Sequence, residues 1–353
     1  MGIVIGALAL GLVYVSMQKK EIIPTPTPVT SAELGVFSAI PYWDQARAVS
    51  VFKKYVRHFD GISLFWYRLS EDGSIVPYAS AVEDLSIITF AHANDVQVFA
   101  LIANLPENGD WDAGLVGNVI GSKEKRKKHI ASIVALVQAK DFDGANIDYE
   151  FLEESQTGDF TAFVKELGSA LHAKGKLLAV AVHAQRPEGE RRGQDIPSLT
   201  GADILVLMTY DEHWETSDPG AMASLPWMRE VLSYMLRIGV PMKKVYFGIP
   251  LDGYDWPFVD PENEEWGEAR GLQYEEAATL ARMRDVEIEF DDRAKAPNFT
   301  YEDRDGLHHE VWFENAQSFE PKFDLAKEFG VGGVALWRLG REDQRIYEVI
   351  AED

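Results

Sequence analysis

The sequence predicts an α/β protein folded as a (β/α)8 TIM barrel with a small α+β insertion between the seventh and eighth strands. Short apolar segments alternate with amphipathic helical patterns over roughly 310 residues, which is the rhythm of eight strand–helix units. Each apolar segment is nearly continuous, as expected for a parallel strand that is covered on both faces. A doubly wound open sheet is the rival arrangement, but the chain has no Gly-x-Gly-x-x-Gly fingerprint.

Eight strands are expected, and the polar, helix-forming stretches between them supply the outer layer. Two of these helices are expected at Phe160–Lys174 and Pro226–Ile238, with Gly175 and Gly239 ending them. The expected strands are Val36–Tyr42, Gly61–Trp66, Val96–Ala103, Gly144–Glu150, Leu177–His183, Ile204–Tyr210, Val245–Pro250 and Gly333–Trp337.

The spacing lengthens after the seventh strand, and we expect an insertion over about residues 257–310 of a catalytic domain that spans 35–350. A helix at Tyr274–Met283 and short strands at Val286–Phe290 and His309–Phe313 would form it. Such a subdomain would wall one side of a cleft.

The sequence predicts that the N-terminus is separate from the catalytic domain. Residues 1–20 are expected to be a hydrophobic anchor or export signal, and residues 21–34 a Pro/Thr-rich linker. The apolar run Ile3–Val15 is short for a membrane span and lacks a small-residue cleavage site, so a buried helix is the alternative. Lys19 and Lys20 follow the apolar run and would favour a cytoplasmic location for the domain behind them. This conflicts with an extracellular catalytic domain, so the orientation stays open. We expect an extracytoplasmic protein, membrane-anchored or secreted.

The composition narrows the classes of partner. The formal charge of −23 disfavours nucleic acid, whose recognition begins with neutralising phosphates, and favours a neutral or cationic substrate. The chain has no cysteine, which excludes disulfides, thiolate metal sites and a cysteine nucleophile. No spacing resembles a metal site, so we expect no metal and no cofactor. We expect a monomer.

The segment Asp143–Glu150 carries the strongest chemical signal. If it is a strand, Asn146, Asp148 and Glu150 share one face because side chains alternate with period two. Three polar side chains in a row inside a barrel are costly to desolvate without partners. We therefore interpret the row as the acid/base centre of a hydrolase.

Other polar and aromatic side chains fall at the carboxyl ends of the expected strands, where barrel enzymes place their sites. Aromatic rings stack on the apolar faces of sugars, and polar groups bond their hydroxyls and amides. This circle of aromatic and polar side chains at the strand ends therefore predicts a carbohydrate site. Its substrate-binding members are expected to be Tyr42, Trp66, Gln185, Asp211, Tyr254 and Trp337, with Tyr210 beside the catalytic row.

These motifs resemble a known family. Asp143–Glu150 is similar to the Asp-Gly-x-Asp-x-Asp-x-Glu signature of glycoside hydrolase family 18, the chitinase-like enzymes. Met208–Asp211, Phe247–Trp256 and Gly332–Trp337 resemble the sixth, seventh and last strands of that family, in order. The resemblance covers about residues 35–345 and implies a β-1,4-linked N-acetylglucosamine glycan, of the peptidoglycan or chitin type, as substrate.

Within the family, Tyr210–Trp214 and Leu336–Gly340 look most like the bacterial spore-cortex and cell-wall branch. Two positions depart from the usual pattern. The middle signature aspartate is Asn146, as in that branch, and Leu101–Asn104 replaces the third-strand Ser-x-Gly-Gly. The first change removes one charge from the carboxylate row, and the second reshapes the floor near Asp148.

Asp148 and Glu150 would approach a sugar from the same side, whereas ordinary retaining glycosidases hold two carboxyls on opposite sides of the bond. The resemblance implies substrate-assisted retention, in which the N-acetyl oxygen of the substrate attacks C1. Glu150 would be the acid and base, Asp148 would orient the acetamido group, Tyr210 would donate to it, and Asn146 would hold Asp148.

Two alternatives remain at this stage. One is a non-catalytic carbohydrate-binding barrel of the same fold, although such relatives usually lose the terminal glutamate. The other is an unrelated barrel enzyme that hydrolyses with metal assistance, because fold alone does not decide function.

Overall fold

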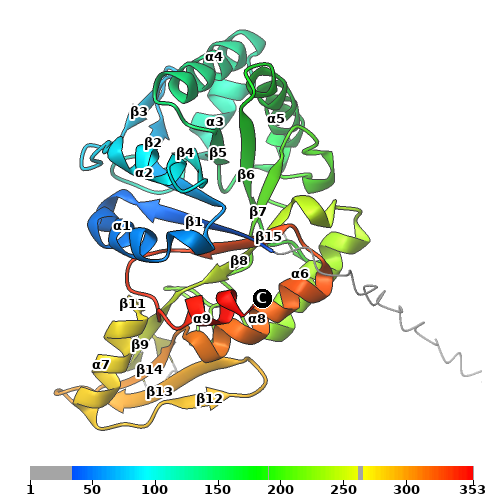
Figure 1. The fold of residues 1–353 in the computed structure, drawn as a ribbon. Helices are drawn as coiled ribbons and strands as arrows, with labels where there is room; N and C mark the ends of the chain where they lie inside the picture. The colour runs from blue at the N-terminus through cyan, green and yellow to red at the C-terminus, as the bar shows by residue number, and fades with distance from the viewer. Residues whose placement is uncertain (1–33, 190, 261–264, 353) are drawn as a thin grey trace, which may run out of the picture.

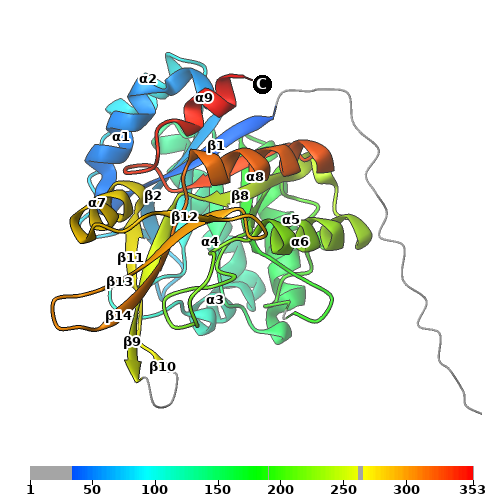
Figure 2. The ribbon, with the colours of Figure 1, turned by 90° about the horizontal axis from the view of Figure 1, so that it is seen from below.

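Eight parallel strands form a closed barrel in the computed structural model, which describes residues 34–189, 191–260 and 265–352 (Figures 1 and 2). Neighbouring strands follow the order of the sequence, and β1 pairs with both β2 and β15, which closes the ring. The predicted (β/α)8 fold is confirmed. The barrel strands are β1 (Gly35–Pro41), β2 (Gly61–Leu69), β4 (Gln97–Ala103), β5 (Gly144–Asp148), β6 (Leu177–His183), β7 (Ile204–Met208), β8 (Val245–Pro250) and β15 (Gly333–Trp337).

Most strand boundaries agree with the prediction to within one residue, and β7 ends at Met208, two residues before the expected Tyr210; two further differences have clear causes. β5 ends at Asp148 rather than Glu150, because the side chain of Asn104 binds the backbone of Glu150 in place of a neighbouring strand. The N–H of Glu150 donates to Asn104 Oδ1 (2.8 Å), and its C=O accepts from Asn104 Nδ2 (3.1 Å). β2 runs on to Leu69 and pairs antiparallel with the extra strand β3 (Ile75–Pro77).

Helices cover the outside of the barrel, and most of the apolar core lies between them and the strands. Gly175 and Gly239 follow α5 and α6 with φ of 67° and 82°, a left-handed geometry that suits glycine and ends a helix. The helices around the barrel are α1 (Gln45–Lys54), α2 (Ser86–His92), α3 (Ala113–Ile120), α4 (Lys123–Ala139), α5 (Thr157–His172), α6 (Leu225–Arg237), α8 (Ala316–Phe329) and α9 (Ile346–Ala351). Short 3-10 turns are η1 (Tyr42–Asp44), η2 (Val56–His58), η3 (Glu154–Gln156), η4 (Ile196–Ser198) and η5 (Met242–Lys244).

A second, smaller core fills the inside of the barrel. Phe37 and Phe99 meet edge to face, with ring centroids 5.2 Å apart, and pack with Ala179, Ile204 and Ala335. Phe37, Phe99 and Ala335 precede the carboxyl ends of their strands. The inner core therefore leaves those ends open above it.

The insertion between β8 and β15 is a six-stranded antiparallel sheet with one helix packed on it (Figure 2). It begins at Asp252, earlier than expected, and includes an unpredicted strand, β13, in which Pro297 and Asn298 mask the strand pattern. Its elements are β9 (Asp252–Asp260), β10 (Glu265–Trp266), β11 (Arg270–Gln273), α7 (Tyr274–Arg284), β12 (Glu289–Asp291), β13 (Ala296–Glu302) and β14 (His308–Trp312).

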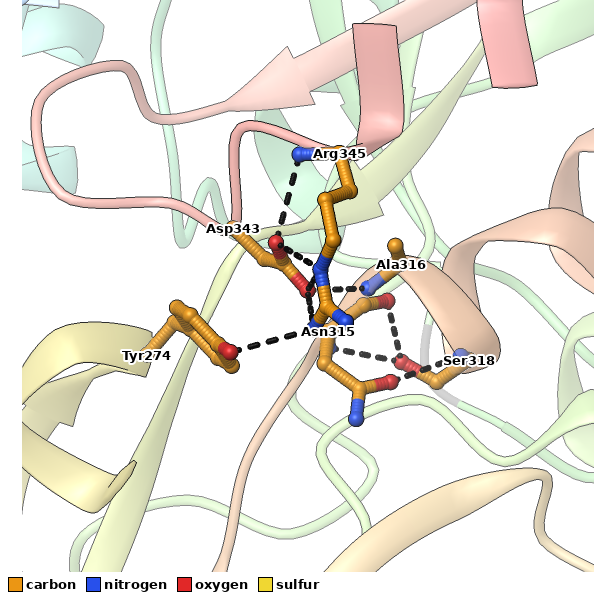
Figure 3. Close-up of polar contacts among 6 residues, drawn as sticks. All are labelled: Tyr274, Asn315, Ala316, Ser318, Asp343 and Arg345. Atoms are coloured by element: carbon orange, nitrogen blue, oxygen red, sulfur yellow. Dashed lines mark hydrogen bonds and ion pairs between the residues drawn. The ribbon is translucent and has the colours of Figure 1, made fainter. Parts of the chain in front are cut away.

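Polar contacts fasten the insertion to the barrel (Figure 3). Arg345 binds both carboxylate oxygens of Asp343 and donates to the Tyr274 hydroxyl at the start of α7 (3.0 Å). Asp343 in turn accepts from the N–H of Ala316 (2.9 Å), while Asn315 caps α8 by accepting from the N–H of Ser318 (2.9 Å). One cluster therefore joins the insertion helix, α8 and the loop after β15.

The expected anchor, residues 1–20, and all but the last residue of the expected linker, 21–34, lie outside the described residues. Within the described part of the chain, no helix combines the length and apolarity that crossing a membrane requires.

Candidate active site

A cleft of about 810 Å³ opens at the carboxyl ends of the barrel strands. The insertion contributes Tyr254 to one wall, and the loop after β6 contributes Arg186 and Arg192 to another. Seven of the ten site residues expected from the sequence line it, namely Asn146, Asp148, Glu150, Tyr210, Asp211, Tyr254 and Trp337.

The inward row on β5 forms the floor beneath the centre of the cleft. Asn146 Nδ2 donates to the hydroxyl of Ser63 on β2 (3.0 Å). Asn146 Oδ1 and Asp148 Oδ1 are both buried and have no hydrogen-bond partner. Because buried acceptors are nearly always satisfied, these two oxygens are available to hydrogen-bond donors of a bound molecule.

Glu150 follows the strand, and the Asn104 clamp on its backbone fixes where its side chain starts. Burial raises the pKa of the Glu150 carboxyl well above its usual value, and the charges of Asp148 and Asp211 raise it further, while Arg192 acts against this. A carboxyl in this environment holds its proton near neutral pH, as a general acid requires.

His183, at the end of β6, lies beside this acid, with Nε2 3.6 Å from a carboxylate oxygen of Glu150. Burial lowers the pKa of His183 to about 3, so the imidazole is neutral. Its Nε2 accepts from the backbone N–H of Phe151 (3.3 Å). The ring therefore brings no positive charge that would favour ionised Glu150.

Three further carboxyls of the cleft also have raised pKa values, and burial is the main reason. The pKa of Asp148 rises to about 7, that of Asp211 to about 6 and that of Asp252 to about 7. Asp211 has a φ of 63°, in the left-handed region that non-glycine residues seldom adopt. Strained backbone and shifted carboxyls of this kind concentrate at functional sites.

Tyr210 and Trp337 form an aromatic surface next to these carboxyls. Their rings are nearly parallel, at 22°, with centroids 6.4 Å apart. Burial and the charge of Asp148 raise the pKa of the Tyr210 phenol well above 10, so it remains a hydrogen-bond donor. An indole face beside a fixed O–H donor suits a sugar ring that carries an amide.

The sequence matches the model of the glycosyl hydrolases family 18 over residues 91–342. The chain belongs to this family. It is 26% identical to the uncharacterized glycosylase YvbX of Bacillus subtilis over 306 residues, covering 84% of this chain and 85% of the relative. It is 26% identical to the cortical fragment-lytic enzyme of Bacillus anthracis over 313 residues, covering 87% and 69%. A crystal structure of a chitinase from Chromobacterium violaceum superposes with a TM-score of 0.82 at 28% identity, covering 90% of this chain and 98% of that one.

Membership of family 18 identifies the chain as a glycoside hydrolase. The resemblance seen in the sequence is thereby confirmed.

Three expected members of the family 18 site lie elsewhere. Trp66 is fully buried in the outer core, because Ser63 and Phe65 of β2 point into the barrel and the alternation turns Trp66 outward. Its indole N–H donates to the side chain of Gln45. Phe65 lines the cleft instead.

The other two support neighbours that line the cleft. Tyr42 stacks on Tyr78, with centroids 4.5 Å apart, and packs under Trp43, which is 48% exposed and lines the cleft. Gln185 is buried, and its Nε2 donates to the backbone carbonyls of Arg191 (3.2 Å) and Gln194 (2.8 Å). Tyr42 is one position away from Trp43, the residue that reaches the cleft. Gln185 lies on a loop whose path the sequence does not reveal.

Sequence reasoning also missed functional candidates. Strand parity through Ser63 could have indicated Phe65. Arg192 had no such signal, because it lies in the middle of the loop after β6.

Proposed function

We propose that this family 18 enzyme hydrolyses β-1,4-linked N-acetylglucosamine glycans, of the peptidoglycan or chitin type, with retention and with the acetamido group of the substrate as nucleophile. The observation that carries the proposal is the pair of unpartnered buried oxygens on Asn146 and Asp148, next to an acid with a raised pKa. An acetamido N–H supplies a donor for the Asp148 oxygen and leaves its carbonyl oxygen near C1.

The steps follow from this placement. Protonated Glu150 gives its proton to the glycosidic oxygen while the acetamido oxygen attacks C1, which releases the leaving sugar and forms an oxazolinium ion. Asp148 stabilises the cation, and Tyr210 donates to the acetamido oxygen. Glu150, now ionised, takes a proton from water, which attacks C1 and restores the acetamide. Trp337 stacks beneath the sugar that is being cleaved.

The same proposal covers where and how the enzyme works. The name of the Bacillus anthracis relative refers to cortical fragments, and the name of the Chromobacterium protein to chitin. Both kinds of glycan lie outside the cytoplasm, so we infer an extracytoplasmic enzyme, held or exported by its apolar segment Ile3–Val15. The residues used in the steps above come from one chain, so a monomer suffices.

The first test compares the native enzyme with Glu150→Gln on purified peptidoglycan and on chitin oligomers, with products identified by mass spectrometry. Loss of the acid is expected to lower kcat about 10²- to 10⁴-fold. Glu275→Gln, on the exposed face of α7, is the matched control and should keep native activity. Equal product release by native enzyme and Glu150→Gln would refute the proposed acid.

The second test concerns the nucleophile. Asp211 and Asp252 also line the cleft, and a covalent mechanism would need one of them to attack C1. Glycosides with the same leaving group, with and without the 2-acetamido substituent, separate the two routes. Substrate assistance predicts turnover of the acetamido compound alone, whereas comparable rates for both would favour a carboxylate nucleophile.

A further inference from the structure

The charges around the cleft are divided between two sides. Among the described residues that line it, the arginines Arg186 and Arg192 both come from the loop after β6. Six carboxyl-bearing residues line the rest of it, namely Asp148, Glu150, Asp211, Glu212, Glu215 and Asp252. A cationic wall is unexpected in a chain with a formal charge of −23. Arg186 also pairs with Glu230 of α6, with Nη1 3.4 Å from a carboxylate oxygen.

Arg192 is held in place by buried groups. Gln185 binds the carbonyls on either side of it, and Gln194 accepts from the N–H of His183 (2.9 Å) while its Nε2 donates to the carbonyl of Ala181 (3.2 Å). Gly193 presses on the chain that follows Glu150: a Cβ there would lie 2.6 Å from the carbonyl oxygen of Glu153. The loop is thus built against the segment that carries the acid.

The guanidinium of Arg192 lies over the ring of Phe151, the residue after the acid, at 4.6 Å from the centroid. Since β6 lies between β5 and β7, its loop stands beside Glu150 and Asp211, and the charge of Arg192 acts on both of these carboxyls.

The opposite side of the mouth belongs to the strands β1 and β15, which carry Trp43 and Trp337. If Trp337 lies beneath the sugar that is cleaved, the sugar beyond Glu150 toward Arg192 is the leaving group. The arginines therefore face the leaving-group side of the scissile bond.

We propose that Arg192, with Arg186 beside it, forms a subsite for a carboxylate on the leaving-group sugar, so that the enzyme favours glycans containing muramic acid over chitin. This rests on the proposed function and names its substrate class. Guanidinium groups bind carboxylates through paired N–H donors, and their positive charge offsets the ionised acids of the cleft, which would disfavour an anionic glycan. The carboxylate comes from the lactyl ether of muramic acid or from a peptide attached to it.

The test pairs a protein change with a substrate change. Native enzyme and Arg192→Gln are assayed on glycan strands stripped of peptide, which expose lactyl carboxylates, and on the same strands with those carboxyls blocked as methylamides. We expect kcat/KM to fall at least tenfold when either Arg192 or the lactyl carboxylate is altered. Altering both should cause no further fall. On chitin tetramer, the loss in kcat/KM caused by Arg192→Gln should be at least tenfold smaller than the loss on the strands with free lactyl carboxylates.

Peptide-bearing strands form the second arm. A loss in Arg192→Gln on stripped strands assigns the lactyl carboxylate, and a loss confined to peptide-bearing strands assigns a peptide carboxylate. Arg192→Lys, which keeps the charge but not the paired donors, should lie between native and Arg192→Gln. Arg282→Gln removes a positive charge from α7, where the side chain bonds Ala278 and Thr279 of the same helix, and should match native on every substrate.

Four results would overturn the inference. Equal losses for Arg192→Gln on chitin and on muramic strands would mean that Arg192 acts on Glu150 rather than on the substrate. Additive losses in the paired design would mean that the two groups do not meet. If native enzyme cleaves neither glycan, both the proposed function and this subsite are refuted. If it cleaves both glycans and Arg192→Gln has no effect on either, the proposed function stands and only the subsite is refuted.

Discussion

Two aspartates that are buried to the same degree differ in what surrounds them. Asp255, in the insertion, is 4% exposed, and its two oxygens bind His309 Nδ1 (2.8 Å) and the Tyr301 hydroxyl (2.9 Å). Asp148, in the barrel, is 5% exposed, and its Oδ1 has no partner. Burial is therefore no guide to function here. Asp148 keeps one unpartnered oxygen inside the cleft, whereas both oxygens of Asp255 bind neighbours in the insertion.

The comparison is tested most severely by Asp148→Asn. We expect kcat to fall about 100-fold or more, because the oxazolinium cation loses its neighbouring negative charge. The free energy of unfolding at pH 7 should stay the same or rise, because burial already disfavours the ionised form of Asp148. Steady-state kinetics and denaturant unfolding measure the two quantities. A variant that is destabilised but fully active would reverse the assignment.

Asp255→Asn is the matched change in the insertion. The change places an amide between Tyr301 and His309, so that its NH2 group faces a hydrogen-bond donor instead of an acceptor. The lost hydrogen bond should lower the free energy of unfolding by about 2–4 kcal/mol. We expect kcat to remain within threefold of native, because Asp255 lies outside the cleft lining. Urea unfolding at constant pH gives the stability. Unchanged stability would show that the cluster contributes little.

Asp252 extends the comparison to pH, because its Oδ1 also lacks a partner and burial raises its pKa from 3.8 to about 7. The folded state then holds the proton more tightly than the unfolded chain does, so this residue makes the protein less stable as pH rises from about 4 to 7. Asp252→Asn removes that loss. Its advantage in unfolding free energy should grow across this range to roughly 1–3 kcal/mol and stay level above pH 7. An advantage that is the same at pH 4 and pH 8 would contradict the assignment.

The smallest expected effect comes from two tryptophans that the sequence does not separate. Trp66→Phe removes buried indole from the outer core and should cost about 1 kcal/mol of stability with KM unchanged. Trp43→Phe, at a ring that is 48% exposed on the cleft, should raise KM several-fold with little loss of stability. Thermal melts and KM on one glycan decide between them. A raised KM in the Trp66 variant would place that residue in the site after all.

The barrel could be predicted because each strand is a continuous apolar run, and the catalytic row because period-two alternation places Asn146 and Asp148 on one face. Trp66 obeys the same rule, which turns it outward between Phe65 and Tyr67 into the outer core. It was expected in the site because it ends the predicted strand, but β2 continues to Leu69 through a register shift after Phe65. The positions of Gln185 and Arg192 depend on the path of a loop. Hydrogen bonds from the side chains of Gln185 and Gln194 to backbone carbonyls determine that path, and no local pattern encodes it.

A single residue, Leu251, separates β8 from β9, and its N–H donates to the carbonyl of Trp337 (2.7 Å). The insertion therefore has no hinge at this attachment about which it could swing like a lid, since hinges are made of residues free to change φ and ψ. Recognition in this cleft should then depend on a glycan that bends to fit a preformed groove, with the distortion of the sugar, rather than closure of the protein, bringing the reacting atoms together.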